Sequence, residues 1–155
     1  MVDNTQYLSQ DKCDALEAEL KELKTKKIPE IATRIDEAKQ LGDLSENAEY
    51  HDARDQMAWT QSRVKEIEFI LANAQIITSG ENVSGVVSIG STVVVKVNGK
   101  EKEYTIVGAQ EADPISGKIS NESPLGDAFM GKKKGNKVQV EVPAGVQEYK
   151  IIALK

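Results

Sequence analysis

Apolar residues recur at alternating spacings of three and four along much of the first half of the chain, a pattern typical of a left-handed coiled coil. One stripe runs through four heptads after residue 50: Ala53, Met57, Thr60, Val64, Ile67, Leu71 and Ala74. A second stripe precedes it: Cys13, Leu16, Leu20, Leu23, Ile31, Ile35 and Ala38. We expect the two stripes to pack on each other as an antiparallel helical hairpin, with arms of about thirty residues and roughly 45 Å.

The residues between these stripes predict where the helices begin, bend and end. Ser9 is a candidate N-cap for the first helix, with Asp11 placed favourably in its first turn. The first stripe shifts in phase around Pro29, which lacks a backbone donor and disfavours helical geometry in the preceding residue. We expect a kink or stutter there rather than a break. Gly42 suits the left-handed residue that ends the first arm.

The pattern changes after residue 77. Residues 78–84 are polar and contain glycine, which predicts a linker. Alternating apolar and polar positions then predict five strands. They cover residues 86–89, 92–97, 102–107, 137–142 and 149–154. Asn98-Gly99 is a strong signal for a hairpin turn between two of these strands, and residues 143–145 predict another turn.

One short helix is predicted among the strands. Ser123 is its candidate cap, Pro124 suits its first turn, and Gly131 suits its end. The fold class is therefore α+β with two domains. Residues 1–77 are expected to form an antiparallel coiled-coil hairpin, and residues 85–155 an antiparallel β-sheet domain with the short helix and a core of its own.

Acidic residues are concentrated in the first of these domains. Residues 1–77 carry a net charge of −6 and residues 78–155 a net charge of +1, which gives −5 for the chain. Such an acidic protein is a poor candidate for generic nucleic-acid binding, which depends on neutralising phosphates. The acid is densest around the hairpin tip at residues 42–50, and the stretch to residue 55 holds one arginine, Arg54, against five acids. These are Asp43, Glu46, Glu49, Asp52 and Asp55.

Cysteine usage and hydropathy predict a cytoplasmic protein. Cys13 is the single cysteine, which excludes an internal disulfide framework and fits a reducing compartment. The sequence has no run of eighteen apolar residues and no basic and apolar N-terminal leader, so neither a membrane span nor a secretory signal is expected. Because Cys13 lies on the first apolar stripe, we interpret it as a packing residue rather than a reactive thiol.

The spacing of the tip carboxylates leaves two interpretations open. Asp43 and Glu46 have the spacing of a capping box, with Asp43 as N-cap of the second helix. Alternatively, Ser45 caps that helix and leaves both carboxylates free. Free carboxylates suit magnesium, which takes oxygen ligands and shares its coordination with phosphates. Two carboxylates do not hold the ion tightly alone, but they would complete a site in another protein that already holds a metal and a phosphodiester.

Two segments carry a resemblance to a known family. Residues 42–51, Gly-Asp-Leu-Ser-Glu-Asn-Ala-Glu-Tyr-His, resemble the tip signature of the bacterial Gre transcript cleavage factors. Residues 123–132, Ser-Pro-Leu-Gly-Asp-Ala-Phe-Met-Gly-Lys, resemble the second signature of that family, and their start is closer to the GreA type than to the GreB type. The two segments occur in the family's order, and the resemblance covers essentially the whole chain.

The resemblance implies an architecture and a function. In such factors an N-terminal coiled coil enters the secondary channel of RNA polymerase, and an FKBP-like C-terminal domain binds the rim of that channel. Asp43 and Glu46 match the acids that help to hold the second magnesium ion of the polymerase's own active centre, which then cleaves backtracked RNA. The factor is thus not itself an enzyme. Its expected partners are RNA polymerase and nascent RNA, and no cofactor is expected in the isolated chain.

The same resemblance assigns further residues. Four residues near the tip match positions that contact the RNA or the polymerase: Lys39, Asn47, Tyr50 and Arg54. Six residues are expected in the polymerase-docking region: Ser123, Pro124, Leu125, Gly126, Phe129 and Gly131. Asn47 is also expected to orient the loop through its amide, Glu49 to be a supporting charge, and His51 to have a surface or packing role. Because Lys39 and Arg54 are the only cations close to the tip, we expect short cleavage products.

Three other classes of protein remain open. A polymerase inhibitor with the same architecture would use tip acids to chelate the metal unproductively, although such relatives carry an aspartate-rich tip. A prolyl isomerase would need an aromatic-lined pocket, for which the C-terminal domain offers Tyr104, Phe129 and Tyr149. A coiled-coil adaptor would leave the acidic tip unexplained. A peptide isomerisation assay and an RNA cleavage assay separate these classes.

Overall fold

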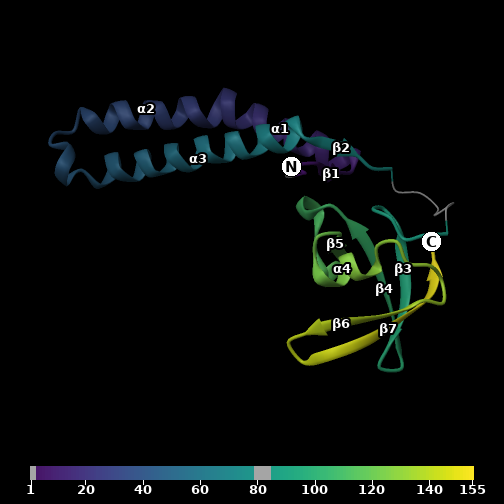
Figure 1. Cartoon of the computed structure of the whole chain (residues 1–155). Coiled ribbons are helices and arrows are strands. Elements are labelled where there is room, and N and C mark those ends of the chain that lie inside the picture. The colour runs from purple at the N-terminus through teal and green to yellow at the C-terminus, as the bar shows by residue number, and fades with distance from the viewer. Residues whose placement is uncertain (1–2, 79–84) are drawn as a thin grey trace. The chain divides into compact units, whose positions relative to one another are not determined.

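The structure is a computed structural model that describes residues 3–78 and 85–155 (Figure 1). These residues form two compact units. The helical unit comprises residues 13–73, and the sheet unit comprises the N-terminal residues to Lys12 together with the chain from Ala74 onward. The predicted linker at residues 78–84 lies, except for Thr78, outside the described residues.

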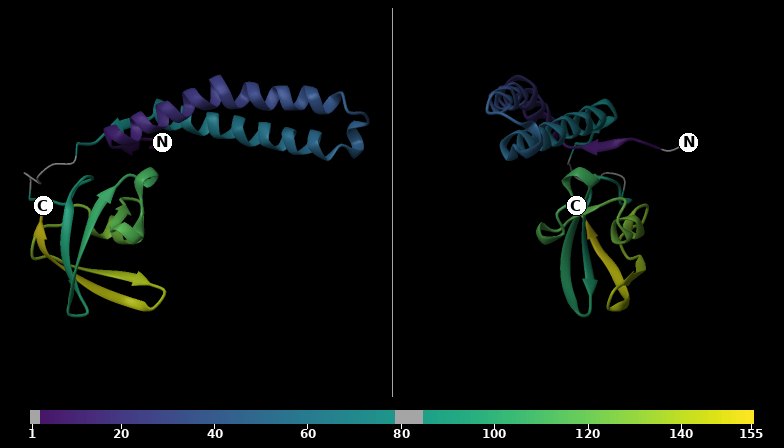
Figure 2. Two further views of the ribbon diagram at one scale, coloured as in Figure 1. Left: turned by 180° about the vertical axis from the view of Figure 1, so that it is seen from behind. Right: turned by 90° about the vertical axis from the view of Figure 1, so that its left-hand side faces the viewer.

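The helical unit is an antiparallel hairpin, as the apolar stripes predict. Its elements are α1 (Gln10–Glu22, whose first three residues belong to the sheet unit), a π-helical turn η1 (Leu23–Lys27), α2 (Ile28–Lys39), a 3-10 turn η2 (Leu44–Glu46) and α3 (Ala48–Ala72). The arms run side by side in both views of Figure 2. Eight residues of the facing stripes are buried: Leu16, Ile31, Ala38, Ala53, Thr60, Val64, Ile67 and Ile70. Side-chain ion pairs, among them Arg63–Glu19, cross between the arms.

The end of the second stripe differs from the prediction. Ile70 rather than Leu71 is buried, and Leu71 is half-buried. Ala74 is not helical, because α3 stops at Ala72 and Asn73 caps its last turn by donating its side-chain amide to the Phe69 carbonyl at 2.8 Å. The helix therefore ends before the last position of the predicted repeat.

The predicted interruption of the first arm is confirmed, and it is a π-helical turn. Between Leu23 and Ile31 the apolar spacing is eight residues instead of seven, so one extra residue must be accommodated. The π-helical turn η1 accommodates it, because its hydrogen bonds span five residues instead of four. Pro29 follows this π-helical turn, in the first turn of α2. The helix continues and keeps Ile31 facing inward.

Two short strands, one before and one after the hairpin in the sequence, were not predicted. β1 (Gln6–Leu8) pairs in parallel with β2 (Ala74–Ile76), and Leu8 is fully buried. The N-terminal segment packs on the 3-10 turn η3 (Ala109–Glu111) of the same unit. There the Glu111 carboxylate accepts hydrogen bonds from the Ser9 backbone N–H at 2.8 Å and from its hydroxyl at 2.5 Å. Ser9 also caps α1, as predicted, by accepting a bond from the Lys12 N–H at 3.2 Å.

A five-stranded sheet forms the rest of the sheet unit. Its strand order is β5-β4-β3-β7-β6, antiparallel except for the parallel pair β4 and β5. The elements are β3 (Thr92–Val97), β4 (Lys100–Val107), the 3-10 turn η4 (Pro114–Ser116), β5 (Lys118–Ser120), α4 (Pro124–Phe129), β6 (Lys137–Val142) and β7 (Gly145–Leu154). Positive φ angles at Asn98 and Gly99 confirm the predicted hairpin turn between β3 and β4. The α+β fold class is thus confirmed.

Three details of the sheet differ from the prediction. Residues 86–89 do not form a strand; Val86 makes one isolated bridge to Lys133. The reason is local, because the Ser91 hydroxyl accepts a bond from the Ser88 N–H at 3.1 Å and turns the chain. β4 and β7 begin earlier than expected, and β5 was not predicted because three residues are too short to show an alternating pattern.

Candidate functional site at the hairpin tip

The tip is the connection between Lys39, where α2 ends, and Ala48, where α3 begins. Residues 40–46 are all exposed. Gly42 has the predicted positive φ, +128°, a backbone conformation that favours glycine. It lies two residues beyond Gln40, the C-cap of α2, so it shapes the turn rather than ending the helix itself. Two large apolar side chains, Leu41 and Leu44, are also exposed beside the acids.

Asp43 orients its own loop. One carboxylate oxygen, Oδ1, accepts hydrogen bonds from the Ser45 N–H at 3.0 Å and from the Ser45 hydroxyl at 2.9 Å. Asp43 thereby caps the 3-10 turn η2. The backbone hydrogen bond from Ser45, followed by the hydroxyl, lowers the pKa of the Asp43 carboxyl. The side chain is therefore a fixed, ionised carboxylate on an exposed loop.

The N-cap of α3 is Asn47, so both predicted capping schemes were wrong. Asp43 caps the 3-10 turn rather than α3, and Ser45 donates to Asp43 rather than capping the helix. The Asn47 Oδ1 accepts a hydrogen bond from the Tyr50 N–H at 3.0 Å. The intervening 3-10 turn, which the spacing pattern does not reveal, moves the cap four residues along the chain.

The Asn47 side chain also confirms the expected role of its amide in orienting the loop. Its Nδ2 donates to the carbonyl oxygen of Ala38 at 2.7 Å, near the end of α2. One side chain therefore bridges the end of one helix and the start of the next.

Glu46 lies between these two capping residues. It occupies the last position of η2 and is exposed. Within residues 3–78 and 85–155, no hydrogen bond or ion pair of its carboxylate is found. Glu46 thus presents a carboxylate to solvent three residues from that of Asp43.

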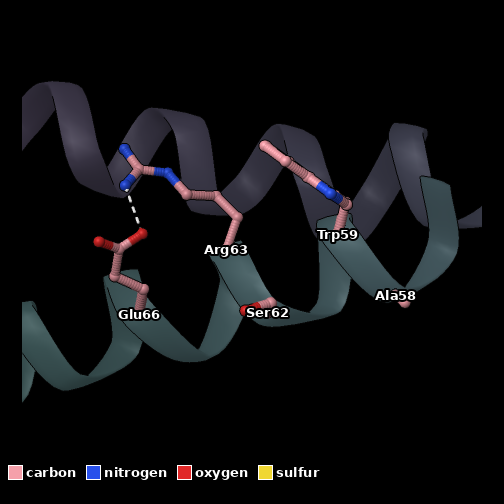
Figure 3. Close-up of a pocket in the computed structure, with 5 residues that line it drawn as sticks. All are labelled: Ala58, Trp59, Ser62, Arg63 and Glu66. Atoms are coloured by element: carbon pink, nitrogen blue, oxygen red, sulfur yellow. Dashed lines mark hydrogen bonds and ion pairs between the residues drawn. The ribbon is translucent and has the colours of Figure 1, made fainter. Parts of the chain in front are cut away.

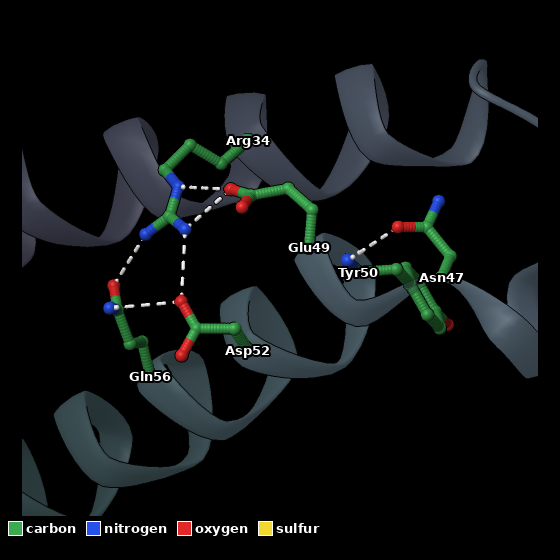
Figure 4. Close-up of polar contacts among 6 residues, drawn as sticks. All are labelled: Arg34, Asn47, Glu49, Tyr50, Asp52 and Gln56. Atoms are coloured by element: carbon green, nitrogen blue, oxygen red, sulfur yellow. Dashed lines mark hydrogen bonds and ion pairs between the residues drawn. The ribbon is translucent and has the colours of Figure 1, made fainter.

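Two of the acids that follow in α3 differ from Asp43 and Glu46, because they form ion pairs with Arg34 of α2 (Figure 4). Its Nη2 lies 2.5 Å from Glu49 Oε1 and 3.1 Å from Asp52 Oδ2, and its Nη1 donates to Gln56 at 2.7 Å. Hydrogen bonding to Glu49, and then to Asp52, raises the pKa of Arg34. Glu49 is thus a supporting charge, as predicted.

The remaining residues predicted near the tip form one aromatic group and an exposed lysine. The rings of Tyr50 and His51 meet edge to face with centroids 5.6 Å apart. Arg54 donates to the Tyr50 hydroxyl at 3.4 Å, and its guanidinium lies 5.9 Å from the centre of that ring. Lys39 is exposed at the end of α2. Their contacts with RNA or polymerase stay predictions.

The second signature forms a closed turn and a buried helix in the sheet unit. Ser123 accepts a hydrogen bond from the Gly126 N–H at 3.1 Å and donates to the Ser120 carbonyl at 2.6 Å. A Cβ atom at Gly126 would lie 1.9 Å from that same carbonyl oxygen, so only glycine fits there. Phe129 is fully buried, whereas Pro124 is exposed and Leu125 half-buried. The docking role of this segment stays a prediction.

The aromatic residues considered for an isomerase pocket pack together instead. Phe129 contacts Tyr104 and Tyr149, with ring centroids 6.2 and 5.8 Å apart. Phe129 is fully buried and Tyr149 is buried, so the rings contribute to the core. Burial raises the pKa of both tyrosines. This arrangement gives no support to an isomerase site.

An exposed tryptophan on α3 was not predicted from the sequence. Trp59 of α3 is 79% exposed and borders a surface hollow, shown in Figure 3. The other lining residues are Ala58, Ser62, Arg63 and Glu66. The Arg63 guanidinium is held by Glu19 and Glu66, which raise its pKa. The position of Trp59 off the apolar stripe was a signal of its exposure.

Residues 3–78 and 85–155, which the structure describes, lack the features of two other kinds of site. They contain no group of three or more histidine, cysteine, aspartate or glutamate side chains arranged to hold a metal ion. They also contain no helix long and apolar enough to cross a membrane. Cys13 is half-buried, and burial together with Glu17 and Asp14 raises the pKa of its thiol, which opposes reactivity.

The chain was compared with known proteins and structures. Two family models match: "Transcription elongation factor, N-terminal" over residues 6–76, and "Transcription elongation factor, GreA/GreB, C-term" over residues 82–155. A protein of Roseiflexus sp. named transcription elongation factor GreA is 48% identical, and the alignment covers the whole of both chains. Proteins of the same name from Clostridium acetobutylicum and Bacillus anthracis are 50% and 43% identical over 90% and 99% of this chain, and over 90% and 98% of their own.

Among solved structures, the GreA factor homolog 1 protein of Thermus thermophilus is similar at 24% identity with a TM-score of 0.44. The match covers 97% of this chain and 99% of that one. The family models together span nearly all of the chain, and the relatives match it over its length. The chain therefore belongs to the GreA/GreB family of transcription elongation factors.

Proposed function

We propose that this chain is a transcription elongation factor that inserts its hairpin tip into the secondary channel of RNA polymerase. There it stimulates the polymerase to cleave backtracked RNA and so rescues arrested complexes. The observation that carries the proposal is the separation of the tip acids. Arg34 holds Glu49 and Asp52, whereas the exposed carboxylates of Asp43 and Glu46 lie on a turn fixed at both ends.

In this proposal, Asp43 and Glu46 supply oxygen ligands to a magnesium ion shared with the polymerase active centre. Carboxylates are suitable magnesium ligands, and one or two are sufficient when phosphate oxygens and other ligands complete the coordination. If bound there, such an ion would supply the chemistry for activating water and stabilising the leaving oxygen during phosphodiester cleavage. Ser45 holds Asp43 through one oxygen, Oδ1, which leaves Oδ2 available for the ion. The chain itself is an accessory factor and not an enzyme.

The other parts of the molecule deliver this pair of carboxylates. The segment from Ser123 to Gly131 contributes to docking on the polymerase, with Phe129 and Gly126 holding its shape from within. Four residues close to the tip would contact nascent RNA or the polymerase: Lys39, Asn47, Tyr50 and Arg54. The factor works in the cytoplasm, where its polymerase partner acts, and it needs no cofactor of its own outside the complex.

Substitution of the tip acids tests this function. Asp43→Asn and Glu46→Gln keep the size of the side chains but remove their charge. Each should reduce stimulated RNA cleavage by about 100-fold, the usual cost of losing a group that stabilises transition-state charge. Binding to the polymerase, measured by competition with labelled unmodified factor, should persist. Asp55→Asn removes an exposed acid elsewhere on α3 and should leave cleavage unchanged.

The outcomes are distinct. Full cleavage by the Asp43→Asn and Glu46→Gln variants would refute the role of the carboxylates. Unmodified factor that binds but suppresses RNA cleavage would identify an inhibitor instead. Mapping the lengths of the RNA products on a stalled complex tests the expectation of short fragments, which predominance of long fragments would contradict.

A further inference from the structure

The loop that carries Asp43 and Glu46 is closed at its base by one side chain. The Asn47 Nδ2 donates to the Ala38 carbonyl at 2.7 Å, while its Oδ1 accepts from the Tyr50 N–H at 3.0 Å. Ala38 is almost fully buried, so the accepting carbonyl belongs to the packed end of α2. The amide therefore joins a rigid point of one helix to the first turn of the other.

The backbone hydrogen bonds of the tip converge on the same two residues. The Ala38 carbonyl also accepts from the Leu41 N–H at 3.1 Å, and the Asn47 N–H donates to the Leu44 carbonyl at 3.4 Å. The Ala38 carbonyl therefore accepts from the backbone of the tip and from the Asn47 side chain. Glu46 immediately precedes Asn47, and Asp43 lies within the segment that these bonds enclose.

We propose that Asn47 is a positioning residue for the stimulated cleavage reaction: its Nδ2 closes the tip loop on Ala38 and holds Asp43 and Glu46 in the geometry that a shared magnesium ion requires. This inference rests on the proposed function of the two acids. It differs from a direct contact with RNA, because both polar atoms of the Asn47 side chain are engaged within the hairpin. Asn47 acts through its neighbours, so its removal moves the carboxylates without changing their chemistry.

The two bonds of Asn47 can be separated by substitution. Ser and Asp are both good N-caps, so Asn47→Ser and Asn47→Asp keep an acceptor for the Tyr50 N–H and preserve the start of α3. Neither retains a donor that reaches the Ala38 carbonyl. Asn47→Ala removes both bonds and also weakens the helix. If only the cap mattered, the Ser and Asp variants would behave like the unmodified protein.

Asn73 provides a matched control. It is an asparagine at the other end of the same helix, where its Nδ2 donates to the Phe69 carbonyl at 2.8 Å. Asn73→Ser makes the same chemical change far along the chain from the acids, and it should leave cleavage unaltered. Thermal unfolding followed by circular dichroism would confirm that all variants keep their helices.

The experiment measures RNA cleavage in a stalled polymerase complex across a magnesium titration, with polymerase binding measured in parallel. We expect Asn47→Ser to lower cleavage by about 10- to 100-fold, as for small misplacements of catalytic groups. It should also raise the magnesium concentration needed for half-maximal cleavage, with binding and helicity retained. Asn47→Asp should behave in the same way, although it adds an acid to the tip.

Asn47→Ser with unchanged cleavage and unchanged magnesium dependence would overturn the inference, as would parallel loss of binding and helicity. The Asp43→Asn variant is assayed in parallel, so that failure of the proposed function can be distinguished from failure of the positioning role of Asn47. If Asp43→Asn still supports cleavage, the proposed function itself fails. If Asp43→Asn abolishes cleavage and Asn47→Ser does not, only the positioning role of Asn47 fails.

Discussion

In both signature segments of the molecule, an N-cap side chain also donates a hydrogen bond to a preceding backbone carbonyl. The two segments nevertheless present very different side chains. At the hairpin tip, Asn47 caps α3 and donates back to the Ala38 carbonyl. In the sheet unit, Ser123 caps α4 and donates back to the Ser120 carbonyl. Each cap therefore satisfies a helical N–H and closes the chain that precedes it.

What the two turns hold is different. The tip turn presents the charged side chains of Asp43 and Glu46 to solvent, with no core beneath them. The second turn buries Phe129 under the sheet and leaves no room for a Cβ at Gly126. The tip is therefore specified by hydrogen bonds and charge, and the second turn by packing. Substitutions at the tip should therefore change electrostatic properties, whereas substitutions in the second turn should lower folding stability.

The largest expected effect on stability is at Gly126. Gly126→Ala places a Cβ 1.9 Å from the Ser120 carbonyl oxygen, so the backbone of the turn must move. Overpacking of this kind costs about 2–3 kcal/mol. Calorimetry should show a lower melting temperature, and polymerase binding should weaken, with cleavage restored at high factor concentration. Asp127→Ala changes an exposed neighbour and is the control; an equal effect of both variants would contradict the packing argument.

A smaller effect is expected where Arg34 holds the two acids below the tip. Arg34→Gln removes its ion pairs with Glu49 and Asp52, and the Arg34 side chain is about one-third exposed. Because solvent screens such exposed pairs, the loss of folding stability should be small compared with that of Gly126→Ala, and it should shrink at high salt. Urea unfolding at low and high salt measures it. Arg54 makes no ion pair with an acid among residues 3–78 and 85–155, so Arg54→Gln should cost less. A loss independent of salt would argue against an electrostatic role.

The smallest effect concerns the ionisation of Asp43. Its pKa is lowered in the folded protein, so the stabilisation from its hydrogen bonds is present above the unfolded-state pKa and is lost as the pH falls through the folded-state pKa. Ser45→Ala removes the hydroxyl donor and keeps the stronger backbone donor. The Asp43 pKa, measured by NMR titration, should rise part of the way to its ordinary value.

Asp3 is the internal reference for that titration. Its carboxylate accepts from the hydroxyl and the N–H of Thr5 in the same arrangement, which lowers its pKa as well. In the Ser45→Ala protein the Asp3 pKa should be unchanged. A rise of the Asp43 pKa to its full ordinary value would mean that the backbone bond contributes nothing.

Long periodic segments were predictable from the sequence, and short or nonlocal ones were not. The spacing of the apolar residues gave both arms of the hairpin, because each buries a continuous stripe over several turns. The three residues of β1 find their partner in β2, which lies 68 positions away in the pairing of Gln6 with Ala74, and no local pattern reports such a contact. The strand expected at residues 86–89 was lost to the turn made by Ser88 and Ser91.

At the candidate site the residue types were predictable, but their partners were not. Asp43, Glu46 and Asn47 stand out as polar residues between two helices. Which of them caps α3 depends on the 3-10 turn, a geometry that spacing alone does not distinguish from a capping box. Arg34 was not associated with Glu49 or Asp52, because their contact follows only from the way α2 and α3 face each other.

The π-helical turn at Leu23–Lys27 has a consequence for how the hairpin tolerates changes in chain length. A π turn takes in one residue more than an α turn while lengthening the helix little. Deleting one residue there should restore ordinary α-helix and leave the phase of Leu16 and Ile31 intact. This single turn should therefore let the chain lose one residue without rotating Asp43 and Glu46 relative to the packed arms.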